Sequence, residues 1–126
     1  MNAKQPTVEI LKAFLDAFNR HDLDAIMDFF CEDCIFDMPR GPEPRGRRYT
    51  GKKEVREGLA TRFSGLPDVH YGNDRHFVSG NRGCSEWLLT GTRPDGERVE
   101  VQGCDLLEFK GDKIFHKDSY WKLVEK

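Results

Sequence analysis

The chain has 126 residues, of which 37% are hydrophobic and 33% charged, and its formal net charge at pH 7 is −2. This balance is typical of one soluble globular domain, and it provides no basic field for nucleic acid or an anionic membrane surface. No apolar run approaches the roughly 20 residues that cross a bilayer, and residues 1–6 lack the apolar region of a signal peptide. We therefore expect a cytoplasmic protein with a single domain, residues 1–126, and with neither nucleic acid nor membrane as a partner.

The four cysteines are expected to be reduced thiols in that compartment. Cys31 and Cys34 have the spacing of a metal or redox pair. One such pair is a weak signal without a second pair or a histidine at finger spacing, so buried or bystander thiols are favoured. His70 and His76 are expected on a solvated strand face and His116 at the surface, and no metal site is predicted.

Two helices are predicted at the start of the chain. The first follows Thr7, a candidate N-cap, and ends near residues 19–21, with its apolar side chains at helical spacing. Asp22 is expected to cap a shorter helix from Leu23 to Phe30, and the two helices form a hairpin. Residues 34–38 predict a short strand that Pro39 ends. The apolar positions of the first helix are Val8, Leu11, Leu15 and Phe18.

Residues 39–51 contain three prolines, three glycines and four arginines, a composition typical of a loop. Two alternatives remain for this loop: a solvated connector, which is favoured, or a mobile rim over a cavity. Thr50 is expected to cap a third helix that ends at Gly65 and Pro67.

Strands separated by turn compositions fill the rest of the chain, at 69–79, 84–92, 99–109 and 114–124. Three helices followed by a run of four strands predict an α+β fold with a mainly antiparallel sheet.

The strand at 99–109 alternates, and its odd positions carry the apolar residues that should face the core. Asp105 is at an odd position. A carboxylate on an apolar face is costly unless it is paired, protonated or exposed to a cavity. We therefore consider two roles for Asp105: a catalytic or ligand-binding acid, or an interior carboxylate that neighbouring side chains satisfy.

The last strand has two alternative faces. In the favoured register Lys117, Ser119 and Trp121 point inward together with Phe115 and Leu123, so that Lys117 approaches Asp105 across the hairpin. A bulge would instead turn Asp118 and Tyr120 inward.

The segments 14–24 and 30–39, together with 105–114 and 117–121, resemble the nuclear transport factor 2-like superfamily, and the likeness covers nearly the whole chain. The SnoaL-like and ketosteroid isomerase-like branches are the most similar. The resemblance implies a cone-shaped fold with three N-terminal helices on a strongly curved sheet that encloses one pocket. It also implies a homodimer.

The resemblance to ketosteroid isomerase extends to one of its three catalytic roles. That enzyme uses a general-base Asp together with a Tyr and a protonated Asp that hold the oxyanion. Asp105 corresponds to the protonated Asp, whereas Phe14 takes the place of the Tyr and Met38 that of the general base. Asp37 precedes Met38 and, as a strand neighbour, should face the other way. Steroid isomerisation by that mechanism is therefore not expected.

The sequence thus predicts a small-molecule pocket protein, with a cofactor-free acid/base enzyme of the isomerase, cyclase or hydratase type as the leading function. Its substrate would be an apolar or aromatic carbonyl compound. The alternatives are a non-catalytic ligand-binding protein and a dimeric interaction module. The candidate catalytic residues are Asp105, Asp37, Lys117 and Asp118. The candidate substrate-binding residues are Phe14, Met38, Trp87, Ser119, Tyr120 and Trp121.

Overall fold

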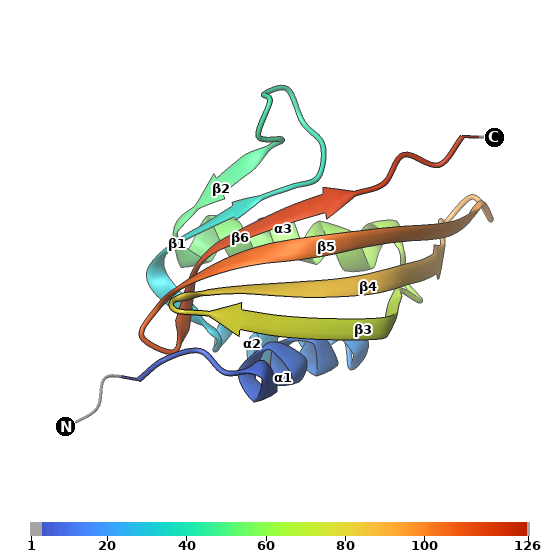
Figure 1. Ribbon diagram of the computed structural model, residues 1–126. Helices are drawn as coiled ribbons and strands as arrows, with labels where there is room; N and C mark the ends of the chain where they lie inside the picture. Colours follow the sequence, from blue (N-terminus) through green and yellow to red (C-terminus); the bar gives the residue numbers. More distant parts are fainter. Residues whose placement is uncertain (1–3, 126) are drawn as a thin grey trace.

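One six-stranded sheet and three helices make up the fold, which a computed structural model describes for residues 4–125 (Figure 1). The strands lie in the order β2-β1-β6-β5-β4-β3, and neighbours are antiparallel except for β1 and β6. The mixed α+β class is therefore confirmed. The elements are α1 (Val8–Asn19), α2 (Leu23–Met27), β1 (Phe30–Asp37), β2 (Arg48–Thr50), α3 (Gly51–Gly65), β3 (His70–Ser79), β4 (Arg82–Thr92), β5 (Arg98–Lys110) and β6 (Lys113–Trp121).

The helices cover one face of the curved sheet, with α1 against β3 and α3 against β1 (Figure 1). The core lies between these layers, and it includes Leu11, Phe18 and Leu59 from the helices and Leu89 and Leu107 from the sheet. We call the helix-covered face the inner face of the sheet and the opposite face the outer face.

Two of the three predicted helix caps are confirmed. The Thr7 hydroxyl accepts a hydrogen bond from the Ile10 amide at 3.2 Å, and an Asp22 carboxylate oxygen accepts one from Ala25 at 3.1 Å. Thr50 precedes α3 but makes no cap with its side chain. Instead the backbone amide of Thr50 donates a hydrogen bond to the Glu54 carboxylate at 3.1 Å. A side chain of the first turn thus bonds back to the residue before the helix, as in one half of a capping box.

The second helix is shorter than predicted, because the chain enters the sheet early. Phe30 already pairs with Ile114 of β6, whose amide donates to the Phe29 carbonyl at 2.7 Å. The first strand therefore begins at Phe30 rather than at residue 34. The predicted loop contains β2, so both β1 and β2 precede α3 and the three helices are not consecutive.

A bulge in β3 overturns the prediction for His76. Asn73 has φ 50°, and the register with β4 shifts between Gly72 and Arg75. The extra residue reverses the alternation of the strand. His76 is consequently turned to the inner face, with its side chain 5% exposed, whereas His70 is exposed as predicted.

The end of the chain also differs from its prediction. Strand β6 ends at Trp121 rather than at Val124, and Leu123, predicted to point inward, is 96% exposed. A second irregularity, between Glu108 and Phe109, leaves Phe115 half-buried.

Candidate functional site

A buried polar cluster surrounds Asp105 on the inner face of the sheet. Asp105 is 3% exposed. Its Oδ1 accepts hydrogen bonds from Ser119 Oγ at 2.6 Å and from Lys117 Nζ at 3.1 Å, and its Oδ2 accepts one from Trp87 Nε1 at 3.2 Å. The favoured register of the last strand is thus confirmed, and so is the approach of Lys117 to Asp105. Four of the predicted site residues meet here.

Lys117 is an unusual partner for Asp105 because its side chain is almost completely buried. Burial lowers the pKa of Lys117, Asp105 raises it, and the result lies below the usual value for a lysine. The rings of Phe18 and Phe36 lie 5.5 and 4.8 Å from Nζ. A lysine with a lowered pKa can donate a proton as the ammonium, or accept one as the amine, closer to neutral pH than an exposed lysine can.

The cluster continues across the sheet as a row of polar residues in direct register. Ser85 is the β4 partner of Asp105, and His76 is the β3 partner of Ser85. His76 Nδ1 lies 2.8 Å from Ser85 Oγ, and its Nε2 lies 2.7 Å from Asp74 Oδ2. The row leads from Asp105 toward the partly exposed Asp74. This row was not predicted from the sequence, because it depends on the bulge in β3. The Gly72–Asn73 pair is the sequence feature that indicates the bulge.

Two aromatic residues, Phe14 and Tyr71, lie in the buried region on the helix side of the sheet. Phe14 packs edge-on against Phe18, Phe29 and Phe30 and is part of the apolar core. Tyr71, which was not predicted, is 6% exposed and meets the Trp87 ring edge-on at 5.0 Å. Burial raises the pKa of Tyr71 to about 12, so its hydroxyl stays protonated at neutral pH and can donate a hydrogen bond.

Three hollows of the described residues have volumes of about 520–610 Å³, the size range of small-molecule sites, and one of them is bordered by residues 20–24 and Arg56. The hollow of 610 Å³ opens where α3, the loop after β1 and the end of β6 meet. We call this 610 Å³ hollow the entrance cavity. Met38, Tyr49, Arg62, Leu66 and Trp121 contribute to its wall, together with residues 39–41 and Arg47 of the loop. The loop is therefore a rim of a cavity, the alternative that was not favoured. Met38 and Trp121, two of the predicted substrate-binding residues, contribute to the wall of this cavity.

Arg62 connects the entrance cavity to the buried cluster. Its guanidinium lies 4.6 Å from the centre of the Trp121 ring in the cavity wall. Burial chiefly determines the pKa values of Tyr71 and Lys117, and the charge of Arg62 opposes the rise in the pKa of Tyr71 and adds to the fall in the pKa of Lys117. Asp105 itself does not line the cavity, so a ligand in it meets Arg62 before it meets the carboxylate.

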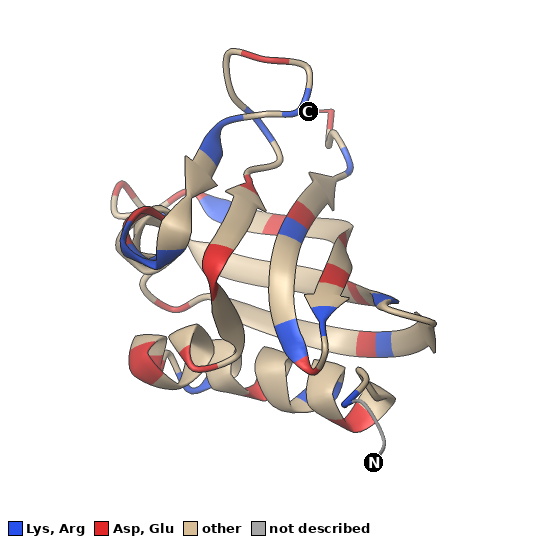
Figure 2. Cartoon of the chain, turned by 90° about the vertical axis from the view of Figure 1, so that its left-hand side faces the viewer, with Lys and Arg blue, Asp and Glu red and all other residues tan. Residues whose placement is uncertain are grey.

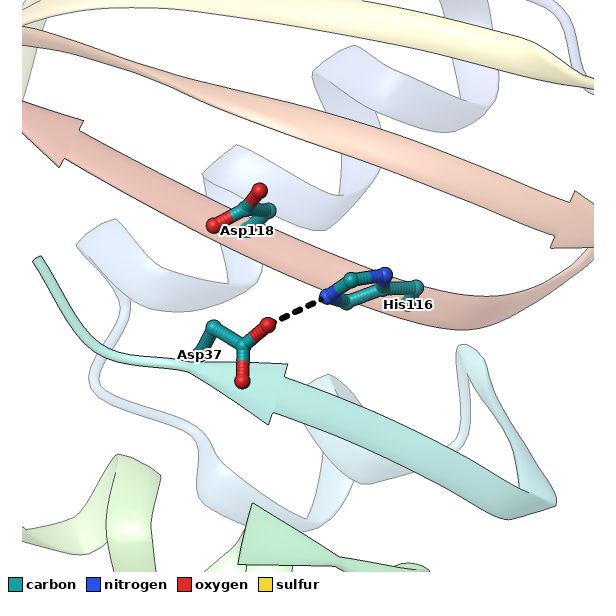
Figure 3. Close-up of side chains that lie close together, drawn as sticks. All are labelled: Asp37, His116 and Asp118. Carbon is teal, nitrogen blue, oxygen red and sulfur yellow. Dashed lines mark hydrogen bonds and ion pairs between the residues drawn. The ribbon is translucent and has the colours of Figure 1, made fainter. Parts of the chain in front are cut away.

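The remaining predicted residues lie on the outer face, away from Asp105. Both oxygens of the buried Asp37 accept hydrogen bonds from Arg48, at 2.8 Å each, and its Oδ2 also lies 2.8 Å from His116 Nε2 (Figure 3). Asp118 lies beside this group and accepts a hydrogen bond from the exposed Tyr120 at 3.1 Å. Asp37 cannot act with Asp105 because the sheet separates them, and Tyr120 does not line the entrance cavity.

Asp37, His116 and Asp118 on the outer face have the ligand atoms of a metal site, but Arg48 already supplies a positive charge to this group. One ligand atom each of Asp37, His116 and Asp118 lies within 4.8 Å of the others (Figure 3). A cation there would have to displace Arg48, which holds both Asp37 oxygens. The arrangement is that of a charge network which ties β2 to β1 and β6.

The Asp37→Asn variant is expected to lose about 1–2 kcal/mol of unfolding free energy at pH 7, because the amide has no negative charge and only one acceptor oxygen for the donors of Arg48 and His116. Burial raises the pKa of Asp37, but Arg48 and His116 lower it more, so its folded-state pKa is below the usual value. The contribution is therefore present above the usual carboxyl pKa and is lost as the pH falls through the folded-state pKa. Urea unfolding of both proteins from pH 7 to pH 3 measures this, and a constant difference over that range contradicts it.

The second hollow, of 520 Å³, lies on the outer face and is called here the outer depression. Glu86, Gln102, Cys104 and Tyr120 contribute to its wall, together with the edges of Trp87 and Trp121. Its wall contains none of the Asp105 cluster except Trp87, so it has a weaker claim to be the site.

Comparison with known proteins assigns the family. The family model described as a SnoaL-like domain matches residues 11–117. No curated protein matches the chain. None of the helices in the described part is long and apolar enough to cross a membrane.

Solved structures share the fold at low sequence identity. A proposed polyketide cyclase from Pseudomonas putida is 18% identical, with a TM-score of 0.83 over 94% of this chain and 93% of that chain. A protein with a ketosteroid isomerase-like fold from Catenulispora acidiphila, in complex with trimethylamine, is 20% identical, with a TM-score of 0.79 over 93% and 88%. TerC, crystallised with polyporic acid, is 17% identical, with a TM-score of 0.77 over 91% and 90%. The chain belongs to the SnoaL-like domain family, with the nuclear transport factor 2-like and ketosteroid isomerase-like fold.

Proposed function

We propose that the protein is a cofactor-free acid/base enzyme of the isomerase, cyclase or hydratase type, which acts on a small apolar or aromatic carbonyl compound. The observation that carries this proposal is the buried Asp105–Lys117–Ser119 cluster, together with a cavity of ligand size whose wall residue Arg62 interacts electrostatically with Lys117. Perturbed ionisable groups next to a cavity are typical of functional sites.

In the proposed reaction, the Asp105 carboxylate takes a proton from the carbon next to the substrate carbonyl. The electron pair of that C–H bond then forms an enolate. The Lys117 ammonium and the Tyr71 hydroxyl are the donors available to the enolate oxygen, in surroundings that exclude water. The same proton returns to another atom of the substrate, so that atoms and charge balance without a cofactor.

Substrate access requires one side-chain movement. Arg62 stands between the entrance cavity and the cluster, so the proposal includes its displacement toward the loop or the solvent. Arginine side chains have several rotatable bonds, and Arg62 forms no ion pair with a carboxylate within residues 4–125. Its displacement would break its interaction with the Tyr71 hydroxyl and its contact with the Trp121 ring.

A thermal-shift screen of apolar carbonyl and aromatic compounds on wild type and Asp105→Asn, followed by turnover assays of the hits, tests the proposal. A ligand that binds the native state raises the melting temperature by mass action. We expect hits on the wild type that are converted by it, and loss of conversion in Asp105→Asn, where the amide cannot accept the proton. Conversion at an unchanged rate in folded Asp105→Asn would overturn the assignment of Asp105.

A non-catalytic ligand-binding protein is the second candidate, and one observation favours it. Asp105 has hydrogen-bond donors on both oxygens within the protein and does not line the entrance cavity. Under this alternative the same hits bind to wild type and Asp105→Asn equally well, and neither protein converts them.

We also propose that the protein is a homodimer. The exposed apolar side chains of Phe77 and Tyr120, at 58% and 53%, lie on strands whose outer face no helix covers. Light scattering after size-exclusion chromatography gives the mass directly, and a mass of one chain at micromolar concentration would contradict it.

A further inference from the structure

The entrance cavity has a one-sided charge. Its wall carries five basic residues and no acidic one: Arg40, Arg47, Arg62, Arg93 and Lys122. Arg93 is neutralised by Glu97 at 3.0 Å, but the other four form no ion pair within residues 4–125. Figure 2 shows basic positions on the loop between β1 and β2 and on the C-terminal segment, which lie at the same end of the molecule.

This local charge contrasts with the rest of the molecule. The chain as a whole is slightly acidic, with a net charge of −2. Elsewhere, several surface arginines are matched by carboxylates, as Arg56 is by Asp24 and Arg75 is by Glu86 at 2.8 Å. The four cations of the entrance cavity therefore do not follow from the composition of the chain. A concave wall with charge of one sign concentrates ligands of the opposite sign.

Arg62 is the centre of this charge. It is half-buried, its guanidinium lies 4.6 Å from the centre of the Trp121 ring, and it forms no ion pair within residues 4–125. A guanidinium presents a planar fork of N–H donors that matches a carboxylate. Its neighbours Met38, Leu66 and Trp121 supply apolar wall for a flat ring.

We propose that the ligand of the entrance cavity is a flat, aromatic or apolar compound that carries a carboxylate. The carboxylate lies on Arg62, and the ring lies against Trp121, Met38 and Leu66. The other cations, Arg40, Arg47 and Lys122, attract the anion to the opening. This inference refines the proposed substrate, and it rests on the proposed function only in taking the entrance cavity as the ligand site.

Calorimetric titration with 2-naphthoate and 2-acetonaphthone tests it, since the two probes share a ring system and differ in charge. We expect tighter binding of the naphthoate, with an affinity that falls as salt is added. Arg62→Gln should weaken naphthoate binding by about 10- to 100-fold and change acetonaphthone binding by a much smaller factor. Arg62→Lys, which keeps the charge but not the fork, should fall between them. Arg75→Gln is the matched control, because Arg75 borders the outer depression and not the entrance cavity.

Equal binding of the two probes, absence of naphthoate binding up to its solubility limit, or an equal loss in Arg75→Gln would overturn the inference. Circular dichroism and the melting temperature of each variant show that it is folded. The proposed catalysis fails separately: naphthoate binding that depends on Arg62, with no turnover of any carbonyl compound, supports the inference and rejects the enzyme. Turnover of neutral ketones by a protein that does not bind naphthoate would support the proposed enzyme and reject the carboxylate inference.

Discussion

Replacing Asp105 with alanine is expected to lower the free energy of unfolding at pH 7 by about 3–5 kcal/mol, because it leaves the Lys117 ammonium buried without an opposite charge. Ser119 and Trp87 also lose their acceptor in this variant. The loss should shrink at alkaline pH. Burial lowers the pKa of Lys117 and Asp105 raises it, so removing Asp105 lowers the folded-state pKa further below the unfolded value near 10.5. The variant therefore loses the lysine proton at a lower pH than the wild type and regains more stability as the pH rises. Urea unfolding at pH 7 and pH 10 measures both effects.

The double variant Asp105→Ala/Lys117→Met is the control for this prediction. It removes the unpaired charge together with its partner and keeps the apolar stem of the lysine. We expect it to be more stable than Asp105→Ala alone, since replacing both members of a buried pair by apolar groups is often neutral. A double variant that is no more stable than the single one would show that the ion pair is not what Asp105 contributes.

Replacing Gly103 with alanine is expected to cost about 3 kcal/mol, close to the upper end for overpacking. A Cβ at this position would lie 2.4 Å from the Tyr120 carbonyl oxygen and 2.6 Å from the Trp87 ring. The carbonyl belongs to β6 and cannot move without disturbing its pairing with β5. The indole can move only by giving up its hydrogen bond to Asp105. Thermal unfolding, with near-UV circular dichroism for the tryptophan environment, measures the effect.

Gly72→Ala is the matched control within the same sheet. Its added Cβ would meet the His70 ring at 3.6 Å and no atom closer, which is ordinary contact. We expect a change within about 1 kcal/mol, with stabilisation because alanine has fewer unfolded conformations. Equal losses of stability in Gly103→Ala and Gly72→Ala would contradict the claim that close packing against Trp87 makes Gly103 sensitive to an added Cβ.

The residues near Asp105 were predictable because they follow from alternation along two strands joined by a hairpin. Once the odd positions of β5 face the core, Asp105 must be buried, and the neighbouring strand brings Lys117 and Ser119 to it. These are short-range consequences of a pattern with a period of two. They needed no knowledge of the helices.

Other parts of the site depend on contacts between distant segments, which a periodic pattern does not contain. The parallel pairing of β1 with β6 brings Asp37 to His116 and Asp118, and the pairing of β1 with β2 brings it to Arg48. The bulge at Asn73 turns the side chain of His76 from the outer to the inner face of the sheet. Arg62 belongs to the end of α3, and its position against Trp121 exists only once α3 packs across the sheet.

A crystal structure of the protein soaked with 2-naphthoate tests most directly whether the entrance cavity holds a ligand whose carboxylate lies on Arg62. We expect ring density against Trp121, with the carboxylate within hydrogen-bond distance of the Arg62 guanidinium. Density in the outer depression beside Glu86 and Tyr120, or an entrance cavity without the compound at saturating concentration, would contradict it.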